Sequence, residues 1–263
     1  MAWEPHQDAD HFLIAVFKSR KGFEKHAKLI INSLENEIRA LNGKIHLRSD
    51  RQSTWDIIDG WDNFVEPNHL NPAIFDFDSI LIAGFKNSES VHTWWSSDQV
   101  FEVMKFRDPI EKMGLFTVDG LVEAFDVNSK TKLSFGDKLM LLEFLKLESF
   151  KPMQRYVDQY KRFSATALKD IGTQCNLTFA EGISGVLMNE FPVEAVCGSS
   201  WRTRSDLTSW YECSNYQKVL MPLRYDHARC LTVVVPLFED NLDTYRKASA
   251  TTGTKLKGLQ LKS

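Results

Sequence analysis

TWWSSDQVFEVMKFRD, at residues 93–108, has a counterpart in the second half of the chain, SWYECSNYQKVLMPLRYD at residues 209–226. Trp94 of the first stretch aligns with Trp210 of the second. Apolar side chains recur at helical spacing in the first stretch, which predicts an amphipathic helix. A repeat of this length indicates an internal duplication, which constrains the fold of the whole chain.

The arginines that end the two stretches, Arg107 and Arg224, align once one extra residue is allowed in the second copy. Further pairs of apolar segments follow in the same order. They are residues 11–23 with 138–150, residues 78–85 with 193–201, and residues 115–120 with 230–235. Each half therefore predicts the order strand, helix, strand, strand, helix, strand. In the gapless pairing of the first two segments, Glu143 falls at the position of Val16.

Three helices are marked by apolar periodicity and by residues that start or stop a helix. They span residues 23–41, 88–106 and 150–171, and glycines follow the first and the third. Ser88 or Ser90 is the expected N-cap of the middle helix, because a serine hydroxyl accepts a bond from an exposed backbone N–H. Pro109 is expected to end that helix.

The order of elements is the split βαβ pattern of ferredoxin-like folds, in which helices cover one face of an antiparallel sheet. The strand segments 12–17 and 139–145 are apolar at nearly every position, so both faces of each sheet should be buried. We therefore expect an α+β protein of two βαββαβ repeats that pack through their helix-free faces, with a chamber between them. The expected parts are an N-terminal tail (1–10), a first repeat (11–125), a linker (126–137), a second repeat (138–240) and a C-terminal tail (241–263).

The composition narrows the class of protein. The chain has 263 residues, of which 43% are hydrophobic, and a formal net charge of −3, so it has no general attraction to nucleic acid or anionic membranes. Its N-terminus lacks a secretory pattern and no stretch is long and apolar enough to span a bilayer, which favours the cytoplasm. The four cysteines form no CxxC pair, so reduced thiols are expected.

No cofactor motif stands out in the sequence. Histidines and carboxylates do not recur at metal-ligand spacing, so we predict no metal site. The chain also lacks the GxGxxG, Walker and GxSxG patterns, so nucleotide cofactors and serine-hydrolase chemistry find no support.

Several motifs of the first half resemble one family. WWSSDQV, running to Arg107, is preceded by NGKIHLRSD and IIDGW and followed by FTVDG. Together they are similar to the DUF1330 family, whose signature is a Trp-Tyr-x-Ser-x-x-Tyr helix that ends in arginine, an arginine on the second strand and an acidic-Gly-x-Trp step. The resemblance covers about residues 11–122, and in the second half only WYECSNYQ to Arg224. Val100 replaces the last tyrosine of the motif in the first half, whereas the second half keeps it as Tyr216.

The resemblance implies the dimeric α/β-barrel superfamily, here as an intramolecular barrel that smaller relatives would build from two chains. It therefore implies a monomer, or at most a weak homodimer. The superfamily includes cofactor-free monooxygenases, isomerases, lyases and haem proteins, and the family itself has no settled activity. We predict no cofactor, and haem is the one that the resemblance leaves open.

Three residues are candidates for catalysis. On the predicted second strand, His46 and Arg48 share a face with Lys44 by the period-two rule, so a base would stand beside an anion anchor if that face is covered. Glu143 lies within an apolar strand, where a buried carboxylate needs a partner or a raised pKa. A solvated edge explains the first group equally well, and a structural ion pair explains Glu143.

Further residues are candidates for holding a substrate. The twin helices offer aromatic rings and terminal arginines, which would line a pocket and bind a carboxylate, or alternatively close the core and cap helix ends. Asp59 matches the acidic step of the family, and His92 precedes the tryptophan pair. The full set is Arg107, Arg224, Trp94, Trp95, Trp210, Tyr211, Tyr216, Asp59 and His92.

These features lead to three hypotheses. The first is a cofactor-independent isomerase, lyase or cyclase, or a monooxygenase-like enzyme, with an aromatic-walled pocket for a hydrophobic carbonyl or carboxylate compound. The second is a binding or carrier protein with the same pocket and a small hydrophobic or haem ligand. The third is a module in which the duplication serves stability alone.

Overall fold

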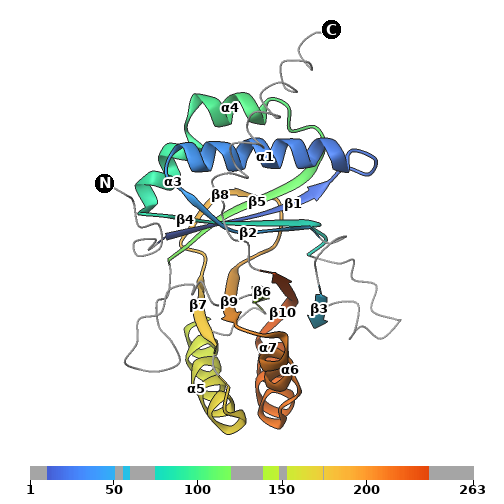
Figure 1. The fold of residues 1–263 in the computed structure, drawn as a ribbon, viewed down its shortest axis with the longest axis vertical. Helices are drawn as coiled ribbons and strands as arrows, with labels where there is room; N and C mark the ends of the chain where they lie inside the picture. Colours follow the sequence, from blue (N-terminus) through green and yellow to red (C-terminus); the bar gives the residue numbers. More distant parts are fainter. Residues whose placement is uncertain are drawn as a thin grey trace.

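The computed structural model describes residues 11–50, 56–59, 75–119, 139–147, 153–173 and 175–236. Two five-stranded antiparallel sheets form the centre of the molecule, and helices lie on their outer sides (Figure 1). The predicted linker at residues 126–137 and the tails at 1–10 and 241–263 lie outside the described residues.

The first half follows the predicted order, with one additional strand and a divided second helix. Its elements are β1 (His11–Ser19), α1 (Glu24–Ala40), β2 (Lys44–Asp50), β3 (Asp56–Asp59), β4 (Ser79–Phe85), α3 (Ser88–Trp95), α4 (Asp98–Met104) and β5 (Ile110–Asp119). β2, β4, β1 and β5 are neighbours in that order, which is the ferredoxin-like arrangement.

The second half repeats the plan. Its elements are β6 (Leu139–Leu147), α5 (Met153–Ile171), β7 (Asn176–Gly182), β8 (Gly185–Asn189), β9 (Ala195–Trp201), α6 (Arg204–Glu212), the π-helix η1 (Tyr216–Leu220), α7 (Met221–His227) and β10 (Ala228–Pro236). The order β10, β6, β9, β7 matches the first sheet strand for strand. The predicted α+β fold of two ferredoxin-like repeats in a dimeric α/β-barrel arrangement is confirmed.

The two halves exchange strands. β8 of the second half pairs with β5 at the edge of the first sheet, and β3 of the first half pairs with β10 at the edge of the second. The sequence analysis missed both strands, because each is short and pairs with a strand of the other repeat. The exchange joins the halves through backbone hydrogen bonds, so neither half forms its complete sheet alone.

The helix-free faces of the two sheets pack against each other. Buried apolar side chains of both sheets form one cluster there, and Phe77 from the first half lies 4.8 Å from Phe144 of the second, centroid to centroid. Mutual burial of the helix-free faces is therefore confirmed. The expected chamber between the two sheets stays a prediction.

Strand register corrects the pairing of Glu143 with Val16. β1 and β6 are both nine residues long and begin at His11 and Leu139, so Glu143 corresponds to Ala15. A slip of one residue moves a side chain to the other face of a sheet. Val16 accordingly faces the core between the sheets, whereas Glu143 lies on the helix side.

The helix boundaries follow local rules, with one exception. Asn42 after α1 and Gly172 after α5 both have positive φ, at 62° and 67°, which is a common way to end a helix. The expected serine cap of the middle helix is wrong, because Asn87 is the N-cap of α3 and accepts a bond from the Ser90 amide. That helix also divides, and Ser97 caps its second part, α4.

No helix among the described residues is long and apolar enough to cross a membrane.

Candidate functional site

Four polar side chains meet between the second sheet and its helices. Arg224 on α7 donates from Nη1 to Glu143 Oε1 on β6 and, over 2.9 Å, to the hydroxyl of Tyr216 on η1. The hydroxyl of Tyr160 on α5 lies 3.5 Å from the same Glu143 oxygen. We call these four residues the Glu143 cluster. Three helical elements and a central strand therefore converge on one buried ion pair.

The cluster is withdrawn from solvent. Arg224 and Tyr216 are fully buried, and Glu143 is 2% exposed. Burial raises the pKa of Glu143 to about 8, and the Tyr160 hydroxyl opposes that shift. Burial also raises the pKa of Tyr216 well above its usual value, with the Glu143 charge adding to the effect. The Tyr216 hydroxyl therefore stays neutral, and Glu143 is the group that exchanges a proton near neutral pH.

The same positions in the first half are apolar. Ala15 corresponds to Glu143 by strand pairing. Ala15 lies opposite Leu115 of β5, and Glu143 lies opposite Thr232 of β10, the equivalent strand of the second half. Counting back from the helix stops Asn42 and Gly172, Ile30 corresponds to Tyr160. Both of these counterparts are buried among apolar side chains.

The counterpart of Tyr216 is fixed by a capping contact. The amide of Val100 donates to Ser97 Oγ at the start of its helix, and the amide of Tyr216 donates to Cys213 Sγ in the same way. Val100 is buried in the apolar layer of the first half. The duplicated fold therefore forms the same layer both with and without a polar cluster.

The extra residue that the alignment required lies in η1. Tyr216 and Arg224 are eight positions apart, whereas residues on one face of an α-helix recur after about seven. The wider turn of a π-helix absorbs one residue and returns Arg224 to the face of Tyr216. Pro222 favours this geometry, because it has no N–H to donate to the Lys218 carbonyl one α-helical turn earlier.

More polar groups lie in this layer of the second half. Thr232 and Cys197 lie directly opposite Glu143 on the strands to either side of β6. Cys230 is buried, which raises the pKa of its thiol. Ser164 follows Tyr160 by one turn of α5, is fully buried, and its Oγ has no hydrogen-bond partner among the described residues.

The structure separates Arg48 from His46, so the prediction that Lys44, His46 and Arg48 all share one face is wrong for Arg48. The register of β2 against β4 shifts between Ile45 and Leu47, which makes His46 the extra residue of a bulge. His46 lies 5.6 Å from the ring of Phe12, centroid to centroid, in the core between the sheets. Burial, with Lys44 adding to it, lowers its pKa to about 3. His46 is therefore neutral at physiological pH.

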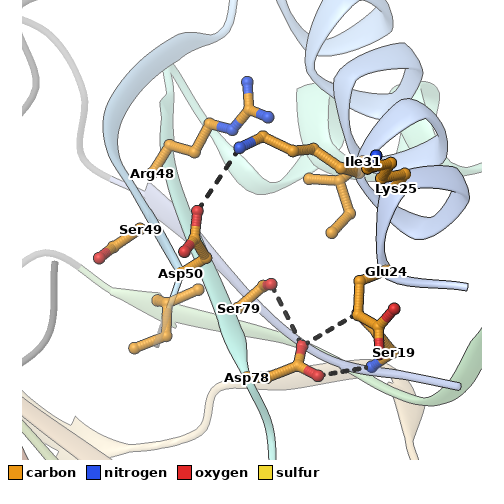
Figure 2. Close-up of a pocket in the computed structure, with 11 residues that line it drawn as sticks. Ser19, Glu24, Lys25, Ile31, Arg48, Ser49, Asp50, Asp78 and Ser79 are labelled. Carbon is orange, nitrogen blue, oxygen red and sulfur yellow. Dashed lines mark hydrogen bonds and ion pairs between the residues drawn. The ribbon is translucent and has the colours of Figure 1, made fainter. Parts of the chain in front are cut away.

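Arg48 lies on the helix side of the first sheet, in the other half from Glu143. Its Nε is 3.0 Å from Glu35 Oε1 on α1. It also lines an open cleft of about 240 Å³ between α1 and the β2–β4 edge (Figure 2).

Most charged groups of this cleft form ion pairs or hydrogen bonds with neighbouring residues. Lys28 pairs with Asp50, and Asp78 accepts bonds from the backbone and hydroxyl of Ser19 and from Ser79 (Figure 2). The carboxylates are thus already engaged, and the exposed pairs contribute little free energy. Of the two regions, the Glu143 cluster is the better candidate site.

The aromatic rings of the twin helices pack in equivalent ways. Trp94 lies against Phe85 at the end of β4, and Trp210 against Trp201 at the end of β9. The ring centroid of Trp210 is also 5.3 Å from that of Tyr216, so it forms a wall of the cluster. Both tryptophans are buried, and of the two Trp210 also contacts the cluster through Tyr216.

The remaining predicted site residues do not join the cluster through any described contact, apart from Tyr211. Its ring lies 5.1 Å from that of Tyr216, centroid to centroid. Trp95 packs on the edge of the first-half core, and His92 is exposed. Asp59 pairs with Thr232 through the backbone of β3, and its side chain lies outside the described part. Sequence reasoning missed Tyr160 and Ser164, whose only signal was polarity on the buried face of a helix.

The described part of the chain shows no grouped metal ligands. Within it, no three histidine, cysteine, aspartate or glutamate side chains lie together so as to hold a metal ion. No disulfide joins any of the four cysteines, in agreement with the expected reduced thiols.

Solved structures with similar folds have little sequence identity to this chain. An anthrone oxidase-like protein has a TM-score of 0.52 and 8% sequence identity, over 89% of this chain and 93% of its own. A chlorite dismutase variant from Candidatus Nitrospira defluvii has a TM-score of 0.48 and 9% identity, over 92% and 96%. No protein-family model matches the chain, and no curated protein matches it in sequence at a significant level.

Proposed function

We propose that the chain is an enzyme that binds a small organic carbonyl or carboxylate compound between the second sheet and its helices, and moves a proton with Glu143. The observation that carries the proposal is the contrast between the two halves. Where the first half has Ala15, Ile30 and Val100, the second has a carboxylate and two tyrosines around a buried arginine.

Stability does not explain this contrast. Desolvating an ion pair costs several kcal/mol per ion, and replacing such a pair by packed apolar residues is often neutral or stabilising. The first half shows that this fold packs the layer with apolar residues. A polar cluster at the same positions therefore points to a role outside folding.

The chemistry of the cluster suits acid–base catalysis without a cofactor. A carboxyl whose pKa lies near neutrality both accepts and returns a proton efficiently. Arg224 would bind the negative charge that develops on a carboxylate or enolate oxygen, and the Tyr216 hydroxyl would hold the guanidinium in place. Isomerisation, elimination and cyclisation next to a carbonyl all need these two functions. His46 and Arg48 lie elsewhere and have no part in this proposal.

Access to the site requires movement of the chain. Every member of the cluster is at most 6% exposed, so a substrate enters only when a covering helix shifts. The π-helix is the expected point of movement, because such turns lack the regular bonding of an α-helix and recur at functional sites.

The test is hydrogen exchange at carbon. The purified full-length chain is incubated in D2O with a set of small ketones, β-keto acids and unsaturated carboxylates, and deuterium uptake is followed by mass spectrometry. We expect wild-type protein to catalyse exchange next to a carbonyl and Glu143→Gln to lose it, while the surface variant Glu102→Gln keeps it. Exchange that persists in folded Glu143→Gln would exclude the assigned role.

A ligand-binding protein without turnover is the second candidate, and the position of His227 favours haem as its ligand. His227 lies three residues after Arg224 on α7, and its Nδ1 is 2.8 Å from the Leu223 carbonyl oxygen. Such a second contact orients histidines whose other nitrogen binds a metal. When bound, haem would supply redox chemistry. A Soret band in reconstituted protein that disappears in His227→Ala would favour this candidate.

The closer kinship with the DUF1330 family is also part of the proposal. Its support is the tryptophan helix that ends in arginine, found in both halves, and the confirmed barrel fold.

A further inference from the structure

Several donor groups gather around Glu143. Arg224, Tyr160 and Tyr216 all present N–H or O–H groups toward this layer, and the Glu143 carboxylate is the acceptor that they share or adjoin. Ser164 adds a fully buried hydroxyl with no hydrogen-bond partner among the described residues. A buried polar group without a partner costs about 1–3 kcal/mol, so such a group in a functional layer indicates a missing acceptor.

Among the buried polar atoms without a hydrogen-bond partner, Ser164 Oγ indicates a ligand best, because the equivalent position of the first half has no hydroxyl. Trp210 Nε1 is also buried without an acceptor, but so is its twin Trp94 Nε1, so the indole is a property of the duplicated fold. The counterpart of Ser164 is Leu34, which is buried in the apolar layer of the first half. The hydroxyl is therefore present in the half that holds the cluster and missing at the equivalent position of the other half.

The electrostatic balance of the layer restricts the ligand further. The titratable groups facing Glu143 from the surrounding elements are Tyr160, Tyr216, Arg224, Cys197 and Cys230. Of these described groups, Arg224 is the one cation. A second negative charge beside ionised Glu143 would have no cation to balance it, and an unbalanced buried charge costs several kcal/mol.

We propose that the ligand is a small organic monoanion, such as a carboxylate, that binds with Glu143 protonated, so that binding to protein with ionised Glu143 takes up one proton from solvent. The anion takes the place of the Glu143 carboxylate beside Arg224, and the protonated Glu143 and Ser164 become donors to it. In the complex, the anion balances the charge of Arg224. This inference rests on the proposed function, since it names the class of ligand for the same site.

The affinity then depends on pH in a defined way. Burial holds the pKa of Glu143 at about 8 in the free protein, and a bound anion raises it further. Below that pH, Glu143 is already protonated, so the affinity does not change with pH. Above it, each binding event must first add a proton, so the Kd rises about tenfold per pH unit.

The experiment is isothermal titration of the full-length protein with acetate and with benzoate. Titrations at about pH 6.5 and about pH 9, in buffers of different ionisation enthalpy, count the protons taken up. We expect uptake close to zero at the lower pH and approaching one at the higher. In Glu143→Gln the Kd should not vary with pH, and Arg224→Met should abolish binding. Ser164→Ala should weaken binding by about three- to tenfold.

Each other result counts against the inference. Binding at high pH without proton uptake, or uptake that persists in Glu143→Gln, would reject the coupling. The wild-type proton count needs no variant, so the test stands even if a variant does not fold. Absence of binding by both anions would reject the ligand class. The proposed function is judged separately by carbon exchange, which does not depend on these anions.

Discussion

Arg107 Nη2 lies 2.9 Å from Glu190 Oε1, and this ion pair joins the first half to the strand that the second half inserts into its sheet. Glu190 also accepts a 2.7 Å hydrogen bond from the Met113 amide through its other oxygen. Arg107 is the twin of the buried Arg224, yet it turns outward, because Ala15 offers no carboxylate inside its own half. One duplicated arginine thus has two uses, an anchor between the halves and a buried partner of Glu143.

The anchor gives the first prediction. Glu190→Ala should lower the free energy of unfolding more than Arg107→Ala, because it removes the backbone bond as well as the ion pair. We expect Glu190→Ala to lower the free energy of unfolding by about 1–2 kcal/mol, and Arg107→Ala, which removes only a half-exposed ion pair, by less than about 1 kcal/mol. Urea denaturation measures both, and Lys105→Ala, which removes an exposed pair with Glu102, is the control. Equal losses for Glu190→Ala and Lys105→Ala would show that the inserted strand needs no anchor.

The buried pair gives a second prediction, in which stability and function separate. Glu143→Ala and Arg224→Met should each lower the free energy of unfolding by about 3–5 kcal/mol, because each leaves a partner stranded in the core. The double variant Glu143→Leu/Arg224→Met should recover most of that loss and bind no ligand. Urea midpoints and the anion titration provide the two readouts. A double variant that loses the sum of the single losses would indicate a structural role for the cluster.

The π-helix gives a third prediction. Deletion of Lys218, which is exposed, should convert η1 to an α-helix and keep Tyr216 and Arg224 on one face, since their spacing becomes seven. The variant should retain its fold and its helical circular dichroism. The control is deletion of Arg162 within α5, where no wide turn can absorb the change and buried residues shift off the core face. Equal damage by both deletions would contradict the assignment of the inserted residue.

Acid sensitivity of His46 gives a fourth prediction. Burial lowers its pKa from 6.5 to about 3, so the unfolded chain takes up a proton before the folded one does. This histidine therefore leaves stability unaffected above about pH 6.5, and lowers it as the pH falls from there toward 3, by about 1.4 kcal/mol per unit. His46→Phe, which keeps a ring against Phe12, should remove that slope. Urea denaturation across this range, compared with the variant, measures it.

The amino-acid sequence predicted much of the fold. The repeated tryptophan motif, the apolar strand segments and the helix stops predicted two βαββαβ repeats that cover each other. Glu143 and Arg224 were each singled out as candidates. Their contact was not predicted, because 81 residues separate them and the gapless alignment placed Glu143 one position off.

The sequence by itself determined the features that depend on short-range interactions. These are the periodicity of helices and strands, the residues that cap or end helices, and the apolar content of each segment. Tertiary structure alone decided which strands cross between halves, that a bulge turns His46 away from Arg48, and which side chains of the two sheets meet in the core. It also brought Tyr160 and Ser164 of α5 over β6. These outcomes depend on register and on packing between distant segments, where a shift of one residue reverses the face on which a side chain lies.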